Sequence, residues 1–81
     1  MLTSYIQAAM HRAHYEIMEE DGAYYGRIPG FDGVWAKEKT LEECREELQS
    51  ALEDWLLLGL RLGHTLPEIN GITLNIEQEV N

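Results

Sequence analysis

Hydrophobic and polar positions alternate with helical spacing from Thr40 to Gly63, the longest regular pattern in the chain. Thr40 followed by Glu43 is typical of a capping box, and Gly63 suits a left-handed helix end. The pattern predicts a helix over residues 41–62, with most of its acidic residues outside the apolar stripe. The stripe consists of Leu41, Cys44, Leu48, Ala51, Leu52, Trp55 and Leu62.

The last part of this predicted helix, from Trp55 to Leu60, is apolar on nearly every side. At about 100° per residue, Leu57 and Leu60 point toward the side that carries glutamates earlier in the helix. Leaving these two leucines in water would forgo roughly 1.5–3 kcal/mol each. They are therefore candidate self-association residues, although a C-terminal segment of the same chain folding over them is an alternative.

The residues before this helix show two other patterns. A helical pattern over residues 4–12, with Ser4 and Gln7 as a second capping box, predicts a short N-terminal helix. Apolar residues then recur with a period of two, which predicts a three-stranded meander over residues 13–38. Asp21 and Gly22 supply the first turn, and Gly26 is a candidate bulge or point of close approach.

After the long helix, residues 72–77 alternate between apolar and polar side chains and predict a last strand. The order is a helix, three strands, the long helix and a strand, which is an α+β fold in one domain spanning residues 1–81. We expect the stripe of the long helix to pack on one face of the sheet.

Composition narrows the classes of ligand. The 81-residue chain carries a formal net charge of −9, so nucleic acid is disfavoured as a direct ligand and a basic protein is a more natural partner. The single cysteine, Cys44, lies on the apolar stripe, so we predict that it is a core residue. One cysteine cannot form an intramolecular disulfide. With no signal peptide and no membrane-spanning run, the expected location is the cytoplasm.

The titratable residues do not form a recognisable reactive pattern. The carboxylates available for metal-dependent nuclease chemistry are Glu16, Asp32, Glu53 and Asp54. Asp32 lies next to Gly33 in a predicted turn, where Asp commonly bonds its own backbone, and the last two extend the acidic side of the helix, which is usually solvated. The three histidines lack completing ligands, and no phosphate-binding glycine motif is present. We expect no catalytic residues, no cofactor, no metal, and a protein that is not an enzyme. The histidines are His11, His14 and His64.

Several motifs in a fixed order resemble the HicB family of antitoxins. They are a tyrosine-rich second strand (YYGRI), the connection IPGFDGVWA, the helix start TLEE and the segment ALEDWL, and they cover roughly Tyr15 to Leu57. The resemblance implies a β-β-β-α-β domain with a partly RNase-H-like layout but without that enzyme's function. It also implies a neutralising partner of a small basic RNA-cleaving toxin of the HicA type.

The chain also departs from the longer members of that family. They usually carry a further DNA-binding segment, whereas this sequence stops at Asn81, soon after the predicted last strand. We therefore expect no direct operator binding, and we expect a dimer or tetramer as in antitoxins of this kind.

Two hypotheses follow for function. In the first, the chain occludes the RNA-binding surface of a HicA-like toxin with an acidic surface that bears aromatic anchors. The alternative is a stand-alone homo-oligomer with a structural or regulatory role and no toxin partner. The candidate toxin-facing residues are Tyr24, Tyr25, Phe31, Asp32 and Trp35.

Overall fold

The structure, a computed structural model, describes residues 2–69 and 71–72. The elements follow one another as α1 (Leu2–His11), β1 (His14–Ile17), β2 (Tyr24–Arg27), β3 (Trp35–Glu38) and α2 (Leu41–Leu62). This order confirms the predicted α+β class. The expected last strand, residues 72–77, lies outside the described residues except for Ile72, which forms an isolated bridge with Ile69.

The three strands form an antiparallel sheet in the order β1-β2-β3. Tyr15, Gly26 and Ala36 lie opposite one another across the strands, and so do Glu16, Tyr25 and Lys37 in the neighbouring row. Because successive side chains of a strand point to opposite faces, these two rows lie on opposite faces of the sheet. The register therefore decides which residues meet the helices.

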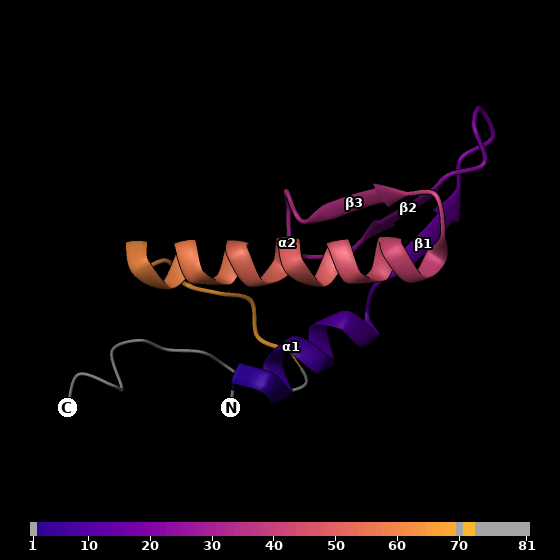
Figure 1. Cartoon of the computed structure of the whole chain (residues 1–81). Coiled ribbons are helices and arrows are strands. Elements are labelled where there is room, and N and C mark those ends of the chain that lie inside the picture. The colour runs from indigo at the N-terminus through magenta and orange to yellow at the C-terminus, as the bar shows by residue number, and fades with distance from the viewer. Residues whose placement is uncertain (1, 70, 73–81) are drawn as a thin grey trace.

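The two helices lie on the same side of the sheet (Figure 1). In this view α2 runs beneath the strands and α1 lies lower still, whereas no described helix lies above the strands. The face that carries Tyr15, Gly26 and Ala36 is the face that α2 covers, because a Cβ at Gly26 would lie 3.1 Å from the Cys44 sulfur of α2. The Cys44 thiol also donates a hydrogen bond to the Ala36 carbonyl. The sheet thus has one covered face and one open face.

The ends of α2 form as the sequence predicts. Thr40 is the N-cap, with its side-chain oxygen accepting a 3.1 Å hydrogen bond from the Glu43 backbone N–H. The Glu43 carboxylate accepts from the Thr40 hydroxyl at 3.2 Å, a variation on the reciprocal bond of a capping box. At the other end, Gly63 has a φ of 73°, a left-handed conformation that glycine adopts at no steric cost.

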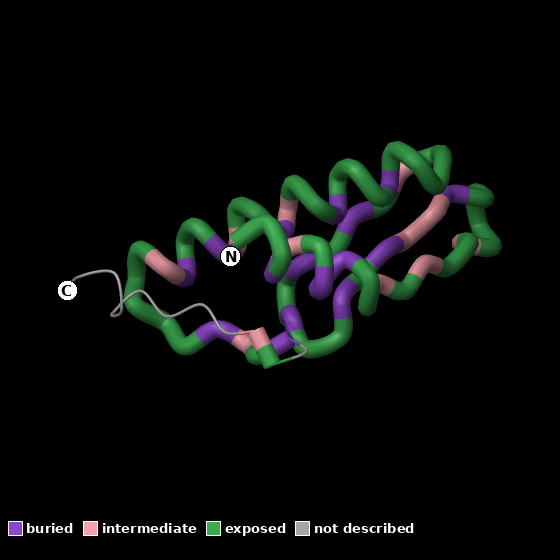
Figure 2. The backbone as a smooth tube through the Cα atoms, turned by 90° about the horizontal axis from the view of Figure 1, so that it is seen from below, coloured by how far each residue is buried: buried purple, intermediate pink, exposed green. Residues whose placement is uncertain are grey.

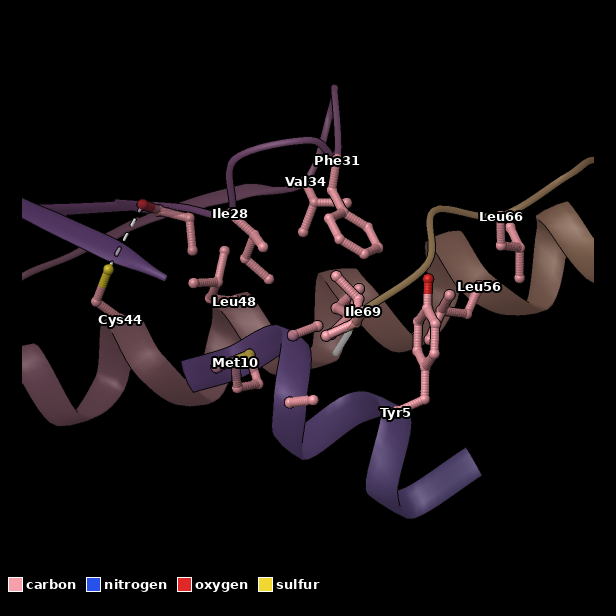
Figure 3. Close-up of a cluster of buried hydrophobic side chains, with 14 residues drawn as sticks. Tyr5, Met10, Ile28, Phe31, Val34, Cys44, Leu48, Leu56, Leu66 and Ile69 are labelled. Carbon is pink, nitrogen blue, oxygen red and sulfur yellow. Dashed lines mark hydrogen bonds between the residues drawn. The ribbon is translucent and has the colours of Figure 1, made fainter. Parts of the chain in front are cut away.

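The core lies between the covered face of the sheet, α2 and α1, and the segment after α2 closes one end (Figure 3). Along α2 the buried positions recur about once per turn, with exposed positions between them (Figure 2). The Tyr5 side chain is fully buried, and its hydroxyl donates to the Pro67 carbonyl. Leu66, in the same returning segment, packs against Gly59, where a Cβ would approach a Leu66 methyl to 2.8 Å.

The predicted stripe of α2 is wrong at three positions. Leu41 is 46% exposed and Leu62 is 59% exposed, whereas Leu56, absent from the predicted stripe, is 1% exposed. The buried line runs through Cys44, Leu48, Leu52 and Leu56 at intervals of four residues, so it drifts around the helix by about 40° per step. The partner changes along this line: Cys44 lies against Gly26 of the sheet, whereas Leu56 lines a groove with α1, and Gly59 meets Leu66 of the segment after α2.

The prediction for α1 also needs a correction. The helix begins at Leu2 and includes Ser4, so Ser4 is not a cap. Its buried residues are Tyr5, Ala8, Ala9 and Met10, whereas Leu2 is 43% exposed. The burial of Tyr5 could not be predicted from the helical pattern, because tyrosine carries a polar hydroxyl. That hydroxyl is buried only because it donates a hydrogen bond to Pro67, which is far away in the sequence.

Candidate interaction surfaces

The open face of the sheet presents a pair of stacked aromatic rings. Tyr25 and Trp35 lie diagonally on neighbouring strands, with ring centroids 6.0 Å apart and an interplanar angle of 27°. Trp35 remains 55% exposed despite this contact. Such diagonal pairs stabilise a sheet modestly, but they leave large apolar area available to a partner. The same face carries His14, Glu16, Arg27 and Lys37.

The turn between β1 and β2 is tied to this face by Asp21. The Asp21 carboxylate accepts a 3.0 Å hydrogen bond from the Ala23 N–H and forms a 3.1 Å ion pair with Lys37. These two interactions, the backbone hydrogen bond first, lower the pKa of the Asp21 carboxyl below its ordinary value. Gly22 beside it has a φ of 71°, as the predicted turn requires.

Phe31, in the connection between β2 and β3, was predicted to face a toxin but lies in the core. Phe31 is 2% exposed and makes edge-to-face contacts with Trp55 at 5.2 Å and with Tyr5 at 6.3 Å between ring centroids. Figure 3 shows its ring directed toward the buried cluster. Phe31 therefore offers no surface to a partner. The next residue, Asp32, is exposed and lines a shallow depression of about 210 Å³ together with Tyr25 and Trp35.

Tyr24 also lies apart from the aromatic pair. It pairs with Glu38 and shares the covered face with Gly26, and its half-buried ring packs against the core. Of the five residues predicted to face a toxin, the structure thus gathers Tyr25, Trp35 and Asp32 on one side. Tyr24 and Phe31 belong to the packed side of the sheet.

The acidic residues of α2 form a separate surface. Six exposed carboxylates follow the side of the helix that points away from the core, and we call them the acidic ridge. Because α2 covers the opposite face of the sheet, the ridge and the aromatic pair do not share one surface. The ridge consists of Glu42, Glu43, Glu46, Glu47, Glu53 and Asp54.

The two candidate self-association residues differ in their surroundings. Leu57 is 57% exposed, whereas Leu60 is only partly exposed and packs against the core cluster. Leu58 and Leu62, which were not among the predicted self-association residues, are 56% and 59% exposed. The apolar end of α2 therefore exposes leucines to solvent on two sides of the helix, at Leu57 and at Leu58 and Leu62.

The potentially reactive groups stand apart from one another. Cys44 is fully buried, and burial raises the pKa of its thiol. Over residues 2–69 and 71–72, no three side chains among His, Cys, Asp and Glu are grouped so that they could hold a metal ion. In the same part of the chain, no helix combines the length and the apolar character that a membrane span requires.

Comparison with known proteins places this arrangement in a family. The UPF0150-like family matches residues 4–67, and the chain belongs to it. The family includes small proteins of the HicB-like antitoxin type. The crystal structure of TTHA0281 from Thermus thermophilus is similar, with 48% sequence identity, coverage of 91% of each chain and a TM-score of 0.84. A comparison with curated proteins finds no match.

Proposed function

We propose that this chain is a HicB-like antitoxin module, which acts in the cytoplasm by binding rather than by catalysis and needs no cofactor. Its partner is a small basic RNA-cleaving toxin of the HicA type. The chain neutralises that toxin by covering the surface with which it binds RNA. Membership of a family that includes HicB-like antitoxin-type proteins supports this assignment.

The exposed pair of Tyr25 and Trp35 is the observation on which the proposal depends. A tryptophan that is 55% exposed, held rigid by a stacked tyrosine on a sheet face that no described helix covers, is typical of an interface anchor. Asp32 and the depression beside the pair offer a carboxylate to a basic side chain of the toxin. We therefore assign the open face as the toxin-binding surface.

The acidic ridge has a different role in this proposal. Its carboxylates lie on the helix side, so they attract a basic toxin at long range without forming the centre of the contact. Electrostatic steering of this kind raises the association rate and weakens as salt screens the charges. Added salt should therefore slow association more than it speeds dissociation.

The alternative is a stand-alone homo-oligomer with a structural or regulatory role and no toxin. The exposed leucines at the end of α2 favour it, because they offer a surface for a second copy that does not involve the open face. The two functions can be distinguished by what binds Trp35. Only the antitoxin proposal requires a different protein there.

The test looks for a small basic protein encoded next to this chain and co-expresses the two. We expect the two proteins to form a complex on co-expression, and we expect the chain to suppress RNA cleavage by that protein. Trp35→Ala should weaken the complex about 30-fold in calorimetry, as for an interface anchor worth about 2 kcal/mol. Ile17→Ala is the matched control, because Ile17 is 63% exposed in the same sheet but lies on the opposite face.

Failure of the neighbouring basic protein to bind would overturn the proposal. If Trp35→Ala and Ile17→Ala weakened the complex equally, the chain would still be an antitoxin, but the open face would not be its binding surface.

A further inference from the structure

The two helices leave a groove on the side of the molecule away from the sheet. Its apolar part has a volume of about 220 Å³ and lies between the start of α1 and the end of α2. The open sheet face does not contribute to it, so the surface is independent of the proposed toxin site. The lining residues are Leu2, Ile6, Glu53, Leu56, Leu57 and Leu60.

The charges along α2 restrict what can occupy this groove. The ridge carboxylates belong to the part of the helix from Glu42 to Asp54, whereas the last eight residues, 55–62, contain Arg61 as their single charged side chain. Two copies in contact along the whole of α2 would bring like charges together. A contact limited to the last turns avoids this repulsion and covers the leucines.

The spacing of charges around Leu57 suits a second copy of the chain. Glu53 and Arg61 lie four residues before and four residues after Leu57, so all three occupy one side of the helix. All three are exposed. In an antiparallel pair of α2 helices with a two-fold axis at Leu57, Glu53 of each copy lies opposite Arg61 of the other.

We propose that two copies of this chain associate through the ends of α2, about a two-fold axis at Leu57. The two Leu57 side chains meet at this axis, beside the grooves between α1 and α2 that they line. Glu53 and Arg61 form two symmetric ion pairs beside this apolar centre. The charge pattern sets the register of the contact, and the leucines supply its buried area.

The test is the size of the purified chain, measured by sedimentation equilibrium without any partner. We expect a dimer, or a larger assembly built from dimers, and we expect Leu57→Asp to weaken the dimer at least about 30-fold. Leu58→Asp is the matched control: Leu58 is 56% exposed against 57% for Leu57, but it points about 100° away around the helix. It should leave the dimer intact.

A charge exchange tests the register independently of the leucines. Arg61→Glu alone and Glu53→Arg alone should each weaken the dimer about 3- to 10-fold, because each places like charges opposite one another. The double variant should recover the original dissociation constant within about threefold. Circular dichroism checks that every variant keeps its helices.

Three results would overturn this inference: a monomeric chain, equal effects of Leu57→Asp and Leu58→Asp, or a double charge variant that fails to recover. Trp35→Ala should remain dimeric, so the failure of toxin binding and the failure of dimerisation can be told apart.

Discussion

The two faces of the sheet are built from different kinds of residue. On the covered face, Tyr15, Gly26 and Ala36 form a row in which small residues let α2 approach closely. On the open face, the neighbouring rows carry the large rings of Tyr25 and Trp35, which no described helix covers. Apolar area on the first face contributes to stability, whereas on the second face it remains available for binding.

This difference explains why aromatic content alone does not locate the interface. Phe31 and Trp35 are four residues apart in one connection and strand, yet their exposed fractions are 2% and 55%. Phe31 points toward Tyr5 and Trp55, and Trp35 points away from both helices. The position relative to α2 therefore separates core aromatics from surface aromatics.

The largest expected effect is the loss of a side chain under the covered face. Leu48→Ala should lower the free energy of unfolding by about 2–5 kcal/mol, because Leu48 is fully buried and its removal leaves a cavity. Trp35→Ala removes a larger side chain but should cost less than about 1.5 kcal/mol, since most of that ring is already in water. Urea denaturation at one fixed protein concentration measures both.

Equal costs for these two variants would contradict the division of the sheet into a stabilising face and a binding face.

A smaller effect is expected where α2 approaches the sheet most closely. A Cβ at Gly26 would lie 2.9 Å from the Tyr15 ring and 3.1 Å from the Cys44 sulfur. Gly26→Ala should therefore destabilise the fold by about 1–3 kcal/mol through overpacking, although alanine suits a strand better than glycine. The same urea denaturation measures it.

The control for Gly26→Ala is a double-mutant cycle with Tyr15→Leu, which replaces the nearest ring. The alanine should cost less in that background, and an unchanged cost would show that the Tyr15 ring is not what excludes a side chain at Gly26.

The parts of the fold that depend on local chemistry could be predicted from the sequence. The ends of α2 follow from Thr40 and Gly63, whose hydrogen bonds involve residues only a few positions away. The three strands follow from their period of two and from the turn at Asp21 and Gly22. For Gly26 the sequence allowed two interpretations, a bulge or a point of close approach, and the structure shows the close approach.

The parts that depend on distant contacts could not be predicted in the same way. A period of two shows that Tyr24 and Tyr25 face opposite sides, but only α2 decides that Tyr24 faces the core. Leu56 and Leu60 lie beside α1, whose position no pattern within α2 reveals. The separation of the acidic ridge from the aromatic pair has the same cause.

The smallest expected effect concerns the ion pair that ties the β1–β2 turn to the open face. The Asp21 carboxyl has a lowered pKa in the folded chain, because it accepts from the Ala23 N–H and pairs with Lys37. A group whose pKa is lower in the folded state contributes stability above its unfolded value, and this contribution is lost as pH falls through the folded value. Asp21→Asn should therefore lower the thermal midpoint slightly at neutral pH, and the difference from the natural chain should vanish in strong acid. A difference that stayed constant down to that pH would assign the effect to the shape of the turn rather than to the charge of Asp21.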